Sequence, residues 1–139
     1  MLYRGTVVVA CALAMAIAGC GSGNFETAKK TNEELLASME QIVVALESVN
    51  SPEDVNAAAA RIDQATATMK SALEKVKGLK ITKQENDKLM EMQQEKMIQL
   101  QTRMASAAVK ANANAGDNPA LDEAFTRFQI AMQQAAQEQ

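Results

Sequence analysis

The methionines are the side chains of this 139-residue sequence whose type and spacing come nearest to a metal site. Seven of the nine methionines follow position 20, and thioether sulfurs are ligands for Cu(I). Met90, Met97 and Met104 share one helix face, but residues seven apart lie roughly 10 Å from one another, too far to meet on one ion. The sequence also lacks histidine, the commonest metal ligand. We therefore expect no metal site and interpret the methionines as adaptable core residues.

The charged and polar residues of the sequence argue against catalysis and against nucleic-acid binding. The 17 acidic side chains have no histidine to act with them as a general base, and the sequence contains no glycine-rich phosphate loop. The 14 basic residues leave a net charge of −3, whereas nucleic-acid-binding domains are strongly basic. We therefore expect a protein that is not an enzyme and that binds no nucleic acid.

A cluster of lysines surrounds the expected turn between the second and third helices. Only Glu74 interrupts this cluster, whose members are Lys70, Lys75, Lys77, Lys80 and Lys83. Lysines at a helix C-terminus suit the helix dipole, so the cluster has an ordinary structural interpretation. The functional alternative is contact with a membrane surface or another anion. The residues predicted to make that contact are Lys75, Lys77, Lys80 and Lys83.

The first twenty residues have the pattern of an export signal. Arg4 is the only charge before Glu26, and the residues from Thr6 to Ala18 are all small or apolar. An apolar run of this length is too short to cross a bilayer, which takes about 20 residues. A basic residue, a short apolar core and small residues at its end are typical of a secretory signal peptide.

The end of this segment, Ile17-Ala18-Gly19-Cys20, resembles the lipobox of bacterial lipoproteins. The resemblance covers the export signal alone and indicates no family for the remainder of the chain. It implies cleavage between Gly19 and Cys20 and a covalent lipid on the Cys20 sulfur. Because the chain has no histidine, we expect no cofactor beside that lipid. Gly21 after the cysteine, rather than aspartate, implies sorting to the outer membrane.

The chain after the signal is rich in good helix formers and has only two prolines. Its apolar residues repeat with the helical period, and none of these stretches alternates in twos. Local signals divide it into four helices. These signals are capping boxes at Thr31 and Thr82, proline starts at Pro52 and Pro119, and glycine stops at Gly78 and Gly116.

We expect an all-α fold, an antiparallel four-helix bundle of up-down-up-down topology, because short connections place successive helices side by side. The alternative is a long helical hairpin that self-associates. Three segments are expected: a cleaved signal peptide over 1–19, a lipidated N-terminus with a flexible tether over 20–30, and the bundle over 31–139.

These features predict a small membrane-anchored bacterial lipoprotein that acts by contact, as a structural or protein-interaction module of the cell envelope. Its expected partners are the membrane, reached through the lipid anchor, and either an envelope protein or a second copy of the chain. Its expected location is the outer membrane, facing the periplasm. The alternative function is a carrier that holds an apolar or metal ligand between the helices, which would require a cavity in the bundle.

Overall fold

The computed structural model describes residues 24–137, which form four α-helices. Cys20 and the signal segment lie outside the described residues. The helices are α1 (Phe25–Glu47), α2 (Val55–Val76), α3 (Lys83–Ala115) and α4 (Ala120–Gln137), with a single 3-10 turn, η1 (Pro52–Asp54), before α2. The part of the chain that the structure describes contains no strand, so the predicted all-α four-helix bundle is confirmed.

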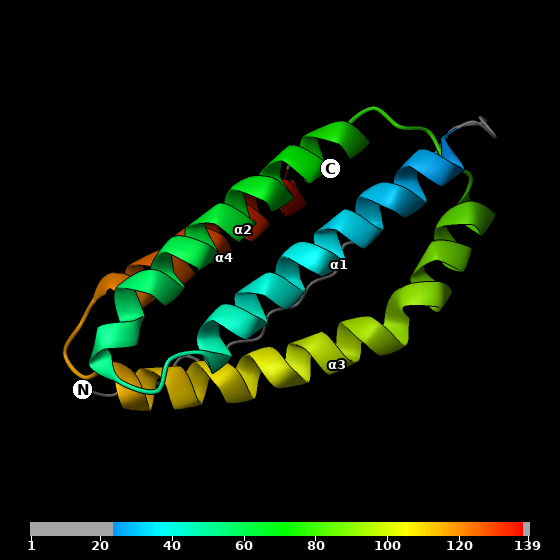
Figure 1. Ribbon diagram of the computed structural model, residues 1–139. Coiled ribbons are helices and arrows are strands. Elements are labelled where there is room, and N and C mark those ends of the chain that lie inside the picture. The colour runs from blue at the N-terminus through cyan, green and yellow to red at the C-terminus, as the bar shows by residue number, and fades with distance from the viewer. Residues whose placement is uncertain (1–23, 138–139) are drawn as a thin grey trace.

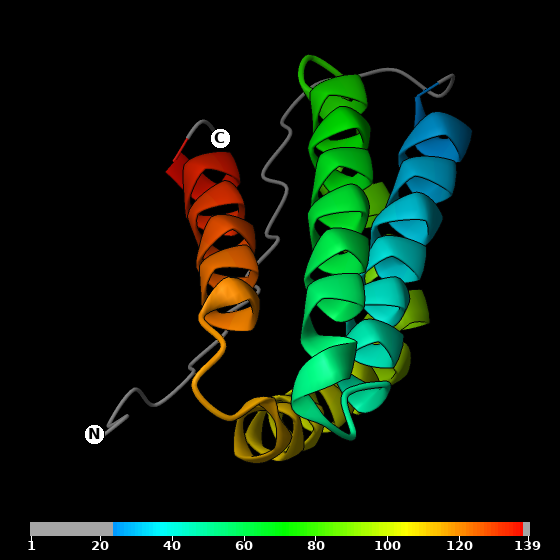
Figure 2. The ribbon, with the colours of Figure 1, turned by 60° about the vertical axis from the view of Figure 1, so that its left-hand side comes forward.

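Helices α1 and α2 form a central antiparallel hairpin, and α3 and α4 pack on its two sides (Figures 1 and 2). The helix directions alternate along the chain, as predicted. Helix α3 packs along α1 and runs in the same direction, because Phe25 lies beside Lys88 at one end and Val49 beside Asn114 at the other. Helix α4 packs along α2 in the same way.

Local sequence signals set the helix boundaries at three of the connections. Pro52 occupies the first position of η1. A backbone N–H at this position has no partner within the helix, so the missing N–H of proline costs no hydrogen bond. Thr82 accepts a hydrogen bond from the Glu85 N–H at 3.2 Å, and the Glu85 carboxylate accepts one from the Thr82 N–H at 2.7 Å. Gly116 ends α3 with a φ of 61°, a backbone conformation that side chains with a Cβ rarely adopt. The helix boundaries predicted at Pro52, Thr82 and Gly116 are therefore confirmed.

The predicted start of the first helix is wrong by six residues. Helix α1 begins at Phe25 rather than Thr31, so residues 25–30 are helical instead of part of the tether. Thr31 is buried inside the helix and does not cap it. The extra turns are stabilised by tertiary contacts that the local sequence does not reveal, since Ala28 is fully buried against the α2–α3 connection.

The main core runs along the inner faces of all four helices. Its largest fully buried side chains are Met39, Ile42, Leu46, Ile62, Met69, Leu100, Leu121 and Phe128. Two buried hydroxyls on the hairpin bond back to their own helices, Ser38 to the Glu34 carbonyl at 2.9 Å and Thr66 to the Ile62 carbonyl at 2.8 Å. Their burial therefore leaves no polar atom unsatisfied, and their small size lets neighbouring helices approach.

A second, smaller apolar cluster closes one end of the bundle. Ile81 in the α2–α3 connection is fully buried between Ala28 of α1 and Leu89 of α3, with Phe25 and Leu79 packed at its edge. This cluster fixes the connection, and the lysines that it carries, to the start of α1.

Candidate functional site

The lysine-rich connection between α2 and α3 lies at the end of the bundle where the chain enters α1 (Figure 1). The side-chain amide of Asn24 donates a hydrogen bond to the Lys80 carbonyl at 3.1 Å. Asn24 follows Cys20 by four positions in the sequence, and an extended chain spans four positions in at most about 14 Å. The fold therefore brings the residue that precedes α1 beside one of the predicted anion-contact residues.

The connection has a defined path over its short length. Lys77 ends α2, and its N–H bonds to the Leu73 carbonyl at 3.2 Å. Gly78 turns the chain with a φ of 82°, in the region that favours glycine. The Leu79 N–H then bonds to the Val76 carbonyl at 3.0 Å, and Thr82 caps α3. The loop is thus held at its beginning, its middle and its end.

Two of the four predicted lysines form ion pairs within the bundle. Lys75 pairs with Glu34 of α1 at 2.9 Å, and Lys77 pairs with Glu74 at 2.6 Å. The hydrogen bond from Lys75 lowers the pKa of Glu34 from its ordinary value, and the positive charge of Lys30 acts in the same direction, more weakly. Lys75 therefore serves a contact between helices, and Lys30 places a further cation at this end of the bundle.

The other two predicted lysines are exposed. Lys80 and Lys83 have no ion-pair partner among residues 24–137. Their charge is therefore available to an external anion.

Three further lysines, which the sequence pattern did not indicate, lie at this end of the bundle. Lys29 and Lys30 lie in the first turns of α1, within the segment predicted as tether, and Lys88 lies in the first turns of α3. The Lys88 ammonium stands 5.7 Å from the centre of the Phe25 ring, close enough for a cation–π contact. The sequence did not indicate this grouping, because it depends on the packing of α1 and α3 against the α2–α3 connection.

The charges are distributed unequally between the two ends of the bundle. Residues 24–34 and 70–91, at the lysine end, contain eight lysines and seven acidic residues, a net charge of +1. Residues 40–63 and 95–127, toward the other end, contain five basic and nine acidic residues, a net charge of −4. An anionic surface would attract the first end and repel the second.

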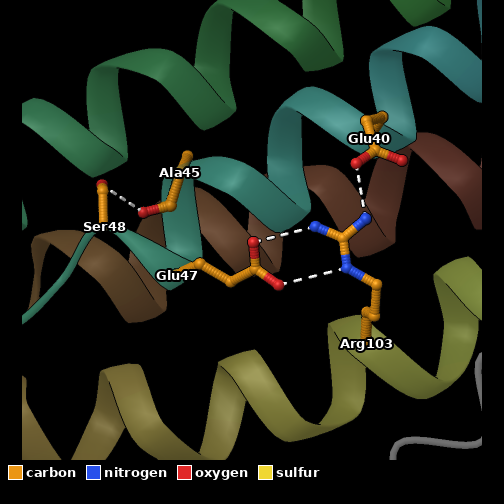
Figure 3. Close-up of polar contacts among 5 residues, drawn as sticks. All are labelled: Glu40, Ala45, Glu47, Ser48 and Arg103. Atoms are coloured by element: carbon orange, nitrogen blue, oxygen red, sulfur yellow. Dashed lines mark hydrogen bonds and ion pairs between the residues drawn. The ribbon is translucent and has the colours of Figure 1, made fainter.

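Two of the three arginines of the acidic half, Arg103 and Arg127, make contacts between helices. Arg103 of α3 donates two hydrogen bonds to Glu47, at 3.2 and 2.8 Å, and one to Glu40 at 2.5 Å (Figure 3). These bonds raise the pKa of Arg103 above its ordinary value. Arg127 of α4 binds both carboxylate oxygens of Asp63 on α2 at 2.8 Å. These guanidinium forks fix α3 and α4 to the central hairpin.

The methionines are spread between the core and the surface. Met104 is buried in the main core, Met97 lies at its margin, and Met90 is 39% exposed. Among residues 24–137 no group of three or more His, Cys, Asp or Glu side chains is placed to hold a metal ion. No helix of this part of the chain combines the length and the apolar character needed to cross a membrane.

Comparisons of the chain with protein-family models, curated proteins and solved structures find no match.

Proposed function

We propose that the chain is a small bacterial lipoprotein, anchored to the outer membrane through a lipid on Cys20, whose lysine-rich end rests on anionic head groups. It acts by contact in the periplasm, as a structural or interaction module, and performs no catalysis. The observation that carries this proposal is the hydrogen bond between Asn24 and Lys80, since it places the entry of the tether and the exposed lysines at one end of the bundle.

The lipid and the lysines have different tasks in this proposal. Acyl chains supply the stable hold on the membrane, and each basic residue near an anionic surface adds about 1 kcal/mol. Screening limits that attraction to about 8 Å at physiological salt. The short tether keeps Lys80 and Lys83 near the surface, so the lysines orient an already anchored bundle with its acidic half directed away.

The lysine contact is tested with vesicles that contain phosphatidylglycerol and with the chain from position 20 carrying Cys20→Ser. All four helices lie within residues 24–137, so this chain retains the whole bundle. At low salt we expect the double variant Lys80→Glu/Lys83→Glu to bind about 30-fold more weakly, because two contacts of about 1 kcal/mol each are lost.

A matched control separates local contact from overall charge. Arg61→Glu/Lys96→Glu makes the same change in net charge at exposed positions away from the connection. We expect it to bind as the unchanged chain does. Equal weakening by both double variants, or by neither, would exclude a contact made by the lysine end.

The anchor is tested separately in cells. Cys20→Ser is expected to abolish incorporation of labelled palmitate and to release the protein from the membrane fraction. A Cys20→Ser protein that remains membrane-bound, or a wild-type protein that takes up no label, would show that Cys20 is not the anchor.

A further inference from the structure

Two apolar side chains lie half-buried at the tip of the lysine end (Figure 1). Phe25, the first residue of α1, and Leu79, in the α2–α3 connection, both pack against the edge of the cluster that contains Ile81. The hydrogen bond from the Asn24 side chain to the Lys80 carbonyl, at 3.1 Å, holds the start of α1 beside the connection. We call Phe25 and Leu79 the apolar rim of the lysine end.

The charges around the apolar rim are mostly positive. The two chain segments that form the tip, residues 24–28 and 77–84, contain three lysines and one glutamate, a net charge of +2. Two of these lysines, Lys80 and Lys83, are exposed and have no ion-pair partner among residues 24–137. The rim is therefore an apolar surface bordered by available cations.

Lys88 gives the Phe25 ring a cover that an anion can remove. The Lys88 ammonium stands 5.7 Å from the ring centre, and a cation–π contact at an exposed position is weak. A phosphate group near the ring offers the ammonium a charged partner in place of the ring, and the long lysine stem lets the ammonium move while its base stays on apolar surface. An anionic surface would therefore draw Lys88 away and uncover the ring on the same side.

The size and composition of the apolar rim fit a lipid surface better than a protein. A stable protein interface buries about 1,200–2,000 Å² and draws on about 20–30 residues from each partner, far more than two half-buried side chains supply. Interfacial binding to a membrane needs fewer apolar groups, because the attraction of basic residues to anionic lipids adds to their burial. Phenylalanine and leucine next to lysines are typical of such membrane contacts.

We propose that the apolar rim inserts into the interfacial layer of an anionic membrane, where Phe25 and Leu79 lie between the head groups. Lys80, Lys83 and Lys88 then contact the phosphates around them. This inference rests on the proposed function, which brings the lysine end to the membrane, and adds an apolar part to that contact. The apolar part persists in salt that screens the lysines.

Tryptophan fluorescence tests the insertion directly, because the chain contains no tryptophan. Phe25→Trp is introduced into the chain from position 20, and its one cysteine, Cys20, is coupled to a maleimide lipid in vesicles that contain phosphatidylglycerol. This coupling replaces the anchor, so the result does not depend on lipidation in cells. Compared with the uncoupled protein in buffer, we expect the emission to shift to shorter wavelength and bromine atoms on the acyl chains to quench it.

A matched tryptophan at the other end of the molecule is the control. Val109 of α3 is 73% exposed, so Val109→Trp should show neither the shift nor the quenching. Unchanged emission from the Phe25→Trp chain, or equal quenching of the two variants, would overturn the insertion. The lysine contact is measured separately, by vesicle binding of the uncoupled Cys20→Ser chain. If that chain binds through its lysines while the Phe25→Trp emission stays unchanged, the insertion alone is wrong.

The binding of the uncoupled Cys20→Ser chain also measures what the ring contributes. Phe25→Ala should weaken binding to the same vesicles about tenfold, because most of the apolar group that enters the interface is removed. That factor should persist in salt that screens the lysines. Ile81→Ala loosens the same cluster but keeps both rim side chains, so it should not weaken binding. Equal weakening by the two variants, or none by Phe25→Ala, would contradict the insertion.

Discussion

Ile81 provides a direct test of whether the lysine end is a separate structural unit. Its side chain is fully buried in a three-residue cluster with Ala28 and Leu89, and the partly buried Leu79 packs against both this cluster and the main core. Ile81→Ala removes three carbon atoms, at about 0.8 kcal/mol for each buried methylene, and leaves a cavity. We expect a loss of about 3 kcal/mol, in the range found for such truncations.

That loss of stability should make the lysine end of the bundle open more easily and should leave the rest of the bundle unaffected. If the small cluster opens without the main core, a loss of about 3 kcal/mol speeds hydrogen exchange over residues 77–89 by about 150-fold. The decrease in the free energy of global unfolding cannot exceed the free energy that keeps this end closed. Once this end is open in the native protein, a weaker Ile81 cluster no longer changes the stability of the main core. Ile62→Ala removes the same atoms from the main core and should lower the melting temperature by about 12 °C while leaving exchange over residues 77–89 unchanged.

Hydrogen exchange followed by mass spectrometry measures the local opening in both variants. Peptides covering residues 24–30 and 77–89 report on the lysine end, and peptides covering residues 55–69 report on the core. The reasoning is refuted if Ile62→Ala accelerates exchange at the lysine end as strongly as Ile81→Ala does, since the two clusters would then open as one cooperative unit.

Three further predictions concern the connections between helices. Hydrogen bonds lower the pKa of Asp54; the bond from the Asn50 backbone has the largest effect, and the bond from the Ser51 side chain comes next. Because these bonds stabilise the charged carboxylate, Asp54→Asn should destabilise the protein at pH 7. That difference is complete above the unfolded pKa of about 4 and should vanish as the pH falls through the lower folded pKa, as urea unfolding at several pH values would show. Thr82→Ala removes the cap of α3 and should cost about 1 kcal/mol in urea unfolding; no change would mean that the cap is not formed in solution. Gly116→Ala forces a Cβ into a positive φ and should cost about 1–3 kcal/mol, whereas a stabilised variant would contradict the backbone conformation.

The helix ends could be predicted from sequence because their signals are local. A proline at the first position, a threonine with a glutamate three residues later, and a glycine after the last turn each act on backbone groups within one turn. Pro52, Thr82 and Gly116 all act in this way, and the structure places helix boundaries at each of them.

The start of α1 and the arrangement of the helices could not be predicted in the same way, because they depend on distant contacts. An apolar stripe shows that one face of a helix is buried, but it does not name the helix that covers the face. The doubled apolar positions of α1, such as Leu35-Leu36 and Ile42-Val43, widen its buried arc and are consistent with a helix covered by two neighbours. The narrow buried stripe of α3 is that of a helix at the edge.

The candidate membrane-contact surface follows from how the fold uses its charges. Lys75 and Arg103 bind carboxylates of neighbouring helices, and these contacts hold the bundle together without offering charge to a partner. What remains available is positive charge at Lys80 and Lys83, at the end of the bundle where α1 begins. In the proposed function, an anionic membrane surface contacts these two lysines. Because the ion pairs and this surface involve different residues, a variant that removes one should leave the other intact.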